Sequence, residues 1–267
     1  MSSNSKSQSV VCSTMRGALL CAALGTTALT TLTVAPDAAH AACVAGAGVV
    51  GGPTSFNVNN TAVPLNLTND CPAPGVSNIA TVLPGNTVTT AVNDAINTGA
   101  LQWEVNNQGT ITSVNNIGVF YAAANGVVTN SGTINGIVAV SFNGGGNSTF
   151  TNNAGGIANG NLGTTIVLSG TGTVTNHGAI NAPGFGNAVF IGAAGGIVNN
   201  TGTITSTNAL GVSTFGGGTV TNAQGASITS SAGSVQFTTT GGTFINAGTV
   251  TSNLTNTAFI GSGDGDI

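Results

Sequence analysis

The sequence has very few charged residues, and almost none of them is basic. Only 3% of the 267 residues are charged, whereas about a quarter of a typical domain is. Lys6 and Arg16 are the two basic residues, so residues 17–267 contain no Lys or Arg. Such a chain cannot neutralise phosphates, which argues against nucleic acid as a partner. It also lacks the Arg side chain that would hold a substrate carboxylate or phosphate through paired hydrogen bonds.

The same scarcity limits the chemistry that the chain can perform. β-Helical pectate lyases use an acidic calcium site with a basic residue, and residues 17–267 supply no such base. A hydrolase with paired carboxylates needs two converging acids, for which Asp94 and Glu104 are the candidate pair. His177 lies between Asn and Gly in a predicted exposed corner, which argues against a catalytic triad. We predict no enzyme activity and keep a polysaccharide-acting β-helix enzyme as an alternative.

The N-terminus has the three parts of a secretory signal peptide. The two basic residues come first, an apolar stretch follows over residues 17–34, and small residues come next. Ala39-His40-Ala41 fits an A-x-A cleavage site. The apolar stretch is short for a transmembrane helix and is diluted by Thr and Gly. The sequence therefore predicts a signal peptide at residues 1–41 and export through the periplasm, to the cell surface or into the medium.

Cysteine is scarce as well. Cleavage after Ala41 leaves Cys43 and Cys71 as the two cysteines of the mature chain. Two cysteines in an exported chain most often pair, so we predict a Cys43–Cys71 disulfide near the mature N-terminus. These cysteines and the distant His177 do not make a tetrahedral zinc site. We expect no metal site and no cofactor.

Small and β-branched residues are abundant, in contrast to the scarce charged residues and cysteines. The chain contains 42 Gly, is 40% hydrophobic and has a mean hydropathy of +0.35. Val, Ile, Leu and Phe recur at regular intervals, which favours an ordered β structure over a low-complexity coil. Most of the apolar side chains are small, so the expected core is thin.

A phrase of the type Val-x-Asn-x-Gly-x-Ile occurs seven times. Residues 128–134, for example, read V-T-N-S-G-T-I. The central asparagines are separated by 22–24 residues, and they are Asn107, Asn130, Asn152, Asn176, Asn200, Asn222 and Asn246. Each phrase is followed by a second apolar run and then, in most copies, by a Gly-rich turn. One period therefore holds about three short strands separated by Gly or Asn corners.

A period of this length with three short strands predicts a parallel β-solenoid. We expect an N-terminal cap at residues 42–100 and about seven coils at residues 101–267. Side chains alternate between the two faces of a strand, so the even-numbered residues of 128–134 point inward and the odd-numbered residues of 129–135 point outward. The inward asparagines can hydrogen-bond to one another as a structural ladder along the stack. Asn also tolerates the left-handed backbone of a sharp corner, and the following Gly permits close backbone approach.

With its signal peptide and repeated V-T-N-x-G-T-I phrases, the chain resembles the passenger region of type V autotransporters over residues 100–267. The resemblance implies a right-handed parallel β-helix on, or released from, the outer surface of a Gram-negative bacterium. It also implies a role in adhesion, self-association or biofilm formation, with host molecules, neighbouring cells or further copies as partners. An autotransporter ends in an outer-membrane β-barrel, and no such segment follows the repeats here. The final residues, G-S-G-D-G-D-I, fall where another coil would begin, so the sequence predicts truncation at the C-terminus.

Outward threonine pairs suggest a second non-catalytic alternative, an ice-binding β-solenoid. The pairs are Thr110/Thr112, Thr203/Thr205, Thr219/Thr221 and Thr249/Thr251. We expect these pairs to lie on different strands of the coil, and several copies lack one Thr, so this alternative ranks below adhesion.

Overall fold

The structure is a computed structural model in which the chain divides into two compact units, Met1–Asp37 and Ala38–Ile267. It describes residues 13–15, 18–20, 43–45, 54–58, 64–70, 78–238, 241–253 and 259–260. In the first unit, β1 (Ser13–Met15) pairs with β2 (Ala18–Leu20) in antiparallel fashion. The predicted signal peptide at residues 1–41 otherwise falls outside the described residues. The predicted Cys43–Cys71 disulfide is also outside them, because Cys71 and the side chain of Cys43 are not described.

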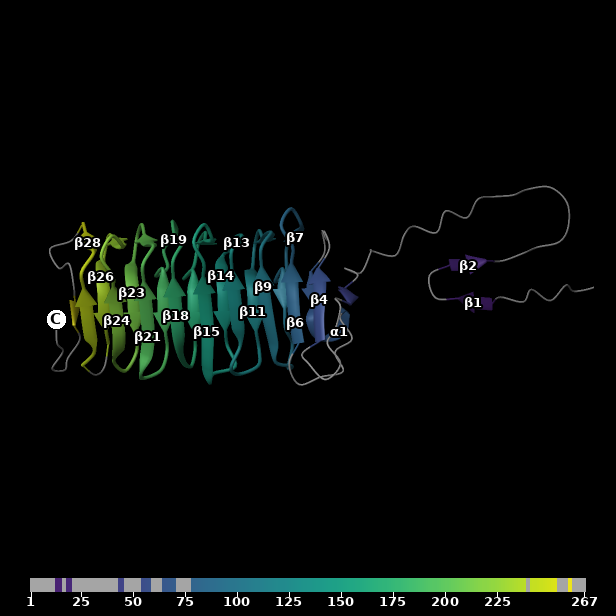
Figure 1. The fold of residues 1–267 in the computed structure, drawn as a ribbon, viewed down its shortest axis with the longest axis horizontal. Helices are drawn as coiled ribbons and strands as arrows, with labels where there is room; N and C mark the ends of the chain where they lie inside the picture. Colours follow the sequence, from purple (N-terminus) through teal and green to yellow (C-terminus); the bar gives the residue numbers. More distant parts are fainter. Residues whose placement is uncertain are drawn as a thin grey trace, which may run out of the picture. The chain divides into compact units, whose positions relative to one another are not determined.

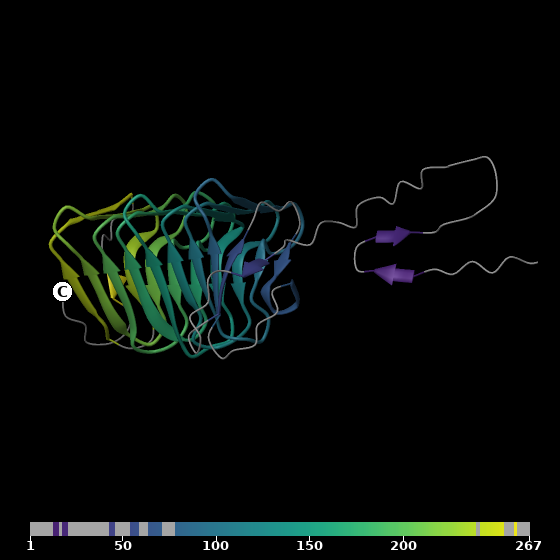
Figure 2. The ribbon, with the colours of Figure 1, turned by 45° about the vertical axis from the view of Figure 1, so that its right-hand side comes forward.

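The second unit is an all-β solenoid, as the repeat predicts, and it has about eight turns where about seven coils were expected. Its strands lie in three sheets, and nearly every strand pairs in parallel with its counterparts one coil before and one coil after (Figures 1 and 2). Within the described residues the three sheets have ten, eight and nine strands, and each coil visits them in that order. The handedness that the resemblance implies stays a prediction.

The ten-stranded sheet consists of β3 (Cys43–Ala45), β4 (Thr54–Val58), β6 (Asn78–Val82), β9 (Trp103–Asn107), β12 (Val127–Asn130), β15 (Asn147–Asn152), β18 (Thr171–Asn176), β21 (Gly196–Asn200), β24 (Gly218–Asn222) and β27 (Thr243–Asn246). The eight-stranded sheet consists of β7 (Thr87–Thr90), β10 (Thr110–Ser113), β13 (Thr133–Gly136), β16 (Ile157–Gly160), β19 (Ala179–Ala182), β22 (Thr203–Ser206), β25 (Ser227–Ser230) and β28 (Thr249–Ser252). The nine-stranded sheet consists of β5 (Leu65–Asn66), β8 (Ile96–Asn97), β11 (Ile117–Tyr121), β14 (Val138–Phe142), β17 (Ile166–Leu168), β20 (Val189–Ile191), β23 (Leu210–Thr214), β26 (Gly233–Phe237) and β29 (Phe259–Ile260). A single helical turn, α1 (Leu67–Asp70), follows β5.

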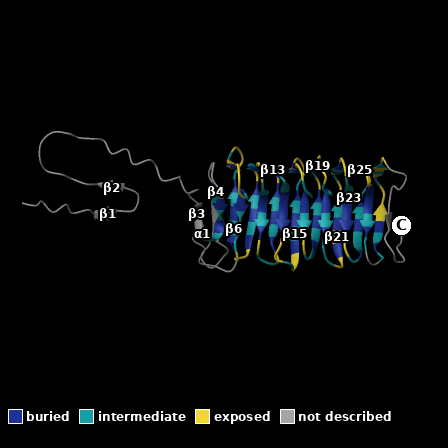
Figure 3. Cartoon of the chain, turned by 180° about the vertical axis from the view of Figure 1, so that it is seen from behind, coloured by how far each residue is buried: buried dark blue, intermediate teal, exposed yellow. Residues whose placement is uncertain are grey.

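The core is one continuous column of apolar side chains along the stack, mostly Val, Ile and Ala with a few aromatic rings. Buried and partly exposed residues alternate along most strands, as Figure 3 shows. In the phrase at 128–134, Val128, Asn130 and Ile134 are fully buried, while Thr129 and Thr133 lie on the outside. The predicted parity is therefore confirmed. Val and Ile suit these positions because their branched side chains pack well on a pleated sheet.

Coil stacking begins earlier in the chain than the Asn count indicates. Residues 42–100, which were expected to form a cap, contribute strands to all three sheets, and β6, β7 and β8 make a full turn before residue 101. Val82 occupies the position of the ladder Asn in this turn, because it is paired in register with Asn107. A count anchored on Asn does not detect a coil whose inward corner residue is Val.

The glycines of the repeated phrase allow the corners of successive coils to stack closely. A Cβ atom placed on Gly132 would lie 2.0 Å from the carbonyl oxygen of Gly109, and one on Gly202 would lie 2.1 Å from that of Gly178. Real Cβ atoms do not approach backbone oxygens so closely, so these corners require the absence of a side chain. The predicted close backbone approach is confirmed.

Candidate interaction surface

The seven predicted ladder asparagines lie in one inward column of the ten-stranded sheet. The strand pairs join Asn107 to Asn130, Asn152, Asn176, Asn200, Asn222 and Asn246 in unbroken register. Val58 and Val82 continue this column at its N-terminal end. Asn107 to Asn222 are buried, whereas Asn246, in the last described strand of the sheet, is exposed.

Hydrogen bonds run along the whole column. Each of the first six asparagines donates its side-chain Nδ2–H to the Oδ1 of the next one, over 2.7–2.8 Å. The same amide also donates to a backbone carbonyl at the following corner, as Asn130 does to Ile157 at 3.1 Å. Equivalent bonds, from 3.0 to 3.2 Å, reach Thr133, Ala179, Thr203, Ser227 and Thr249. The buried amides are thereby satisfied as both donors and acceptors.

The sequence also led us to expect a left-handed backbone at these corner asparagines, and this expectation is wrong. Among the described non-glycine residues only Asn125 has a positive φ, of 58°, and it is not a member of the ladder. The ladder asparagines are the last residues of their strands and have extended backbones. Asn is needed at this position for its amide group and not for its tolerance of the left-handed region.

The outer face of the eight-stranded sheet carries a second polar column. Asn159 donates to Asn135 Oδ1 at 2.8 Å, and Asn181 donates to Asn159 Oδ1 at 2.9 Å. Asn135 in turn donates to the Oγ1 of Thr112 at 3.1 Å. These side chains are half-buried between their neighbours. The remaining positions of this column are threonines, and the sequence pattern alone did not show that they share one sheet.

A row of exposed apolar side chains follows the corner between the eight- and nine-stranded sheets. We call Val92, Val114, Leu162 and Phe185 the apolar ridge, and their exposed fractions are 69%, 55%, 58% and 80%. Each belongs to the connection that follows β7, β10, β16 or β19. The last two are adjacent, because the N–H of Phe185 donates to the carbonyl of Leu162 at 3.1 Å.

The corner that carries Phe185 is fixed from both sides. A Cβ atom on Gly184 or Gly186 would lie within 2.5 Å of the backbone of the preceding coil, so the two glycines beside Phe185 let this corner stack closely. From the following coil, the Asn208 side chain donates to the carbonyl of Gly184 at 3.0 Å. The exposed aromatic ring therefore projects from a well-supported backbone.

The phenylalanines spread along the coils are only partly core residues. Phe142 and Phe237 are buried, but Phe215 is 48% exposed, and Phe120 and Phe190 lie half-buried on the outer face of the nine-stranded sheet. The physical reason is strand parity, because Phe120 immediately precedes the inward Tyr121 and Phe190 follows the inward Val189.

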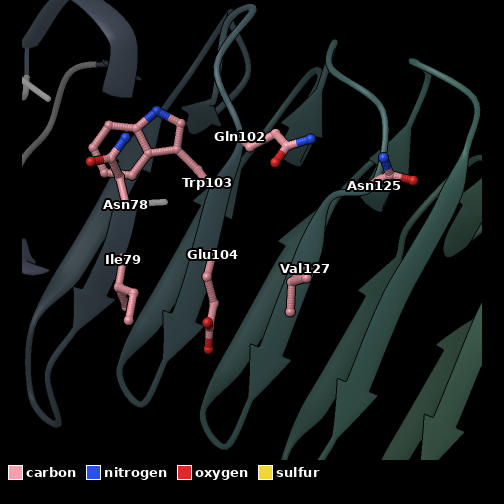
Figure 4. Close-up of a pocket in the computed structure, with 7 residues that line it drawn as sticks. All are labelled: Asn78, Ile79, Gln102, Trp103, Glu104, Asn125 and Val127. Carbon is pink, nitrogen blue, oxygen red and sulfur yellow. The ribbon is translucent and has the colours of Figure 1, made fainter. Parts of the chain in front are cut away.

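The two acids considered for catalysis line separate depressions. Glu104 lies on β9 between Ile79 and Val127 of the neighbouring strands, and all three line a depression of about 190 Å³ (Figure 4). Asp94 borders a depression of about 210 Å³ at the corner before β8. No depression described in the structure contains both carboxylates. The structure therefore does not pair them as acid and base across a common space.

Burial raises the pKa of the Asp94 carboxyl above its ordinary value of 3.8. Hydrogen bonds from the Ile117 N–H at 3.3 Å and from the Asn97 amide at 3.2 Å act in the opposite direction. Burial likewise raises the pKa of the Tyr121 phenol, whose oxygen lies 2.7 Å from the Val127 carbonyl oxygen. His177 is exposed, and its Nδ1 lies 2.6 Å from Thr201 Oγ1. These groups do not converge on one site.

The described residues contain no cluster of three or more His, Cys, Asp or Glu side chains that could hold a metal ion. None of the helices in the described part of the chain has the length and apolarity to cross a membrane. No protein-family model, no curated protein and no solved structure matches the chain.

Proposed function

We propose that this chain is a non-catalytic, exported surface protein that acts in adhesion, self-association or biofilm formation. The observation that carries the proposal is the apolar ridge, in particular Leu162 and Phe185, which are among the most exposed large apolar side chains of the described residues. Leu162 and Phe185 are neighbours, and exposed large apolar side chains that lie side by side are typical of contact sites. As an autotransporter-like passenger, the solenoid would present the ridge away from the cell.

The magnitude of such a contact fits adhesion between surfaces that carry many copies. Complete burial of one large apolar side chain contributes about 1.5–3 kcal/mol, so the ridge of one molecule binds only weakly. Many weak contacts between two surfaces act together through their high effective concentration. With only 3% charged residues the chain exerts little long-range electrostatic attraction, so binding would depend little on salt.

Cells that display the chain provide the test. We expect them to aggregate or to adhere to a surface, and Phe185→Asn should remove most of this effect. Phe215→Asn is the matched control, because Phe215 is also an exposed aromatic residue at a corner but lies outside the ridge. Aggregation of displaying cells among themselves would indicate self-association, and attachment to other cells alone would indicate a host or neighbouring-cell molecule. Displayed chain that does neither would rule out the proposal.

The enzyme alternative has its own experiment. The purified chain would be incubated with a panel of polysaccharides, and the appearance of reducing ends or unsaturated products would be measured. We expect no cleavage, since Asp94 and Glu104 line separate depressions. Cleavage that disappears in Asp94→Asn would replace our proposal with an enzyme.

A further inference from the structure

The outer face of the eight-stranded sheet is a regular two-column array. Each strand contributes two outward residues, at positions i and i+2, and we call this set the threonine face. Its columns are Thr87, Thr110, Thr133, Ile157, Ala179, Thr203, Ser227 and Thr249, and Thr89, Thr112, Asn135, Asn159, Asn181, Thr205, Thr229 and Thr251.

The register of this face is unbroken across all eight described strands. Adjacent parallel strands lie about 4.8 Å apart, and residues two apart in one strand are separated by about 6.6 Å. The face therefore repeats its side chains on a nearly rectangular lattice of these two distances. Three of the four threonine pairs noted in the sequence, beginning at Thr110, Thr203 and Thr249, belong to it. The expectation that the pairs lie on different strands is wrong for these three.

The second column is also held in position. Asn135, Asn159 and Asn181 are hydrogen-bonded to one another and to Thr112, so their amide groups are fixed before any ligand arrives. Side-chain ladders of this kind are one of the means by which a sheet of many strands is kept flat. A surface that is already ordered loses little conformational entropy on binding.

We propose that the threonine face binds ice. Hydroxyl groups on a rigid, flat lattice can hold a first layer of water at the repeat distances of the sheet, and these lie close to repeats between oxygen atoms in ice. The threonine methyl groups fill the space between the held waters. Neither column contains a charged residue, whose hydration shell would disturb an ice-like layer.

Other flat solids fit the face less well. Crystalline polysaccharides are bound through aromatic rings that stack on sugar rings, and neither column contains an aromatic residue. The ten-stranded sheet also has outward threonines, but its corresponding columns are interrupted by Glu104, Val127, Ile197 and Ile245. The eight-stranded sheet is thus the more regular surface.

The first column lacks a hydroxyl residue in two adjacent strands, so variants can be designed both to strengthen and to weaken binding to ice. Ile157 and Ala179 replace the hydroxyl residue in two adjacent strands of the first column. Filling the gap with Ile157→Thr and Ala179→Thr should increase binding to ice. Thr205→Tyr should block it, because the larger ring would stand above the plane of the neighbouring side chains.

The experiment measures thermal hysteresis and the inhibition of ice recrystallisation with the purified chain. We expect activity in the wild type, loss of most of it in Thr205→Tyr, and a gain in the double threonine variant. Thr175→Tyr is the matched control, because Thr175 lies on the outer face of the ten-stranded sheet with similar exposure. Thermal unfolding of each variant verifies that the solenoid is intact.

Three results would overturn the assignment. A wild-type chain without thermal hysteresis or inhibition of recrystallisation would exclude ice as the ligand. Equal losses in Thr205→Tyr and Thr175→Tyr would show that the threonine face is not the binding surface. A dimer in sedimentation experiments that Thr205→Tyr dissociates, without any effect on ice, would assign the face to a second copy of the chain. The ridge variant Phe185→Asn should retain ice binding, which keeps this test separate from the test of adhesion.

Discussion

The solenoid contains two asparagine ladders that use the same side chain at the same coil spacing in different ways. The inner ladder, represented by Asn130 and Asn152, is buried, and its amides donate toward the next coil and also to a backbone carbonyl. The outer ladder of Asn135, Asn159 and Asn181 is half-exposed, and its amides donate toward the preceding coil. Threonines replace Asn at the other positions of the outer column.

The difference shows that burial, and not the ladder itself, decides how strictly Asn is required. A buried amide without partners costs about 1–3 kcal/mol for each unsatisfied group, so every buried member of the inner ladder depends on its neighbours. On the outer face water can take the place of a missing partner. Thr can therefore replace Asn there.

The largest expected effect comes from breaking the inner ladder at its centre. Asn152→Leu removes the acceptor of the Asn130 amide and the donor to Asn176 Oδ1 and to the Ala179 carbonyl. We expect a loss of about 3 kcal/mol in the free energy of unfolding, because several buried polar groups lose a partner. The measurement is denaturant unfolding followed by circular dichroism. A loss below about 1 kcal/mol would contradict the role assigned to the inner ladder.

Removal of a buried hydroxyl group that lacks a hydrogen-bond partner should increase the free energy of unfolding. Thr214 is fully buried in β23, in register between Ile191 and Phe237, and its Oγ1 has no hydrogen-bond partner among the described residues. Thr214→Val keeps the shape and removes the unpaired group, so we expect stabilisation by about 1 kcal/mol. A higher midpoint of thermal unfolding would verify this, and a lower midpoint would indicate that the hydroxyl is satisfied.

The outer ladder should tolerate the exchange that the inner ladder does not. Asn159→Thr places at this position the residue that occupies the same column at Thr112 and Thr205. We expect a change in unfolding free energy of less than about 0.5 kcal/mol, as for most surface substitutions. The same unfolding experiment serves both ladders. Equal costs for Asn159→Thr and Asn152→Leu would remove burial as the explanation of their difference.

The smallest effect concerns Asp94, which lies at a corner outside both ladders. The pKa of Asp94 in the folded state is raised above 3.8. Asp94 therefore stabilises the folded state most at pH values below the pKa that it has in the unfolded chain. Its contribution is lost as the pH rises through the folded-state pKa. The stability of the wild type should therefore decline slightly above pH 3.8, and Asp94→Asn should flatten this part of the curve. A decline of equal size in the variant would assign it to other groups.

Much of the fold follows from the sequence because a repeated residue type marks a column of the stack. The Asn-x-Gly phrase gave the coil period, the parity of Val128 and Ile134 and the members of the inner ladder. The first coil was missed because Val82 fills the same column with different chemistry. A column can be identified from one sequence only where its residues resemble one another.

The surface could be predicted less well, for two physical reasons. Corner lengths vary between copies, so the sequence does not show which outward threonines share a sheet, and the register of the threonine face became visible only in the structure. The apolar ridge has no period at all. The Pro-Gly-Phe-Gly run at residues 183–186 was its one signal, since glycines on both sides of a large apolar residue indicate a tightly stacked corner.

The inner ladder also makes the coils interchangeable. Each ladder Asn accepts a hydrogen bond from the coil before it and donates one to the coil after it. The corner glycines allow the backbones of neighbouring coils to approach closely. A chain in which one coil is duplicated or deleted between two ladder asparagines would form the same contacts between neighbouring coils. The number of repeats thus sets how far the molecule reaches, at about 4.8 Å for each copy, without any change in the way that neighbouring copies fit together.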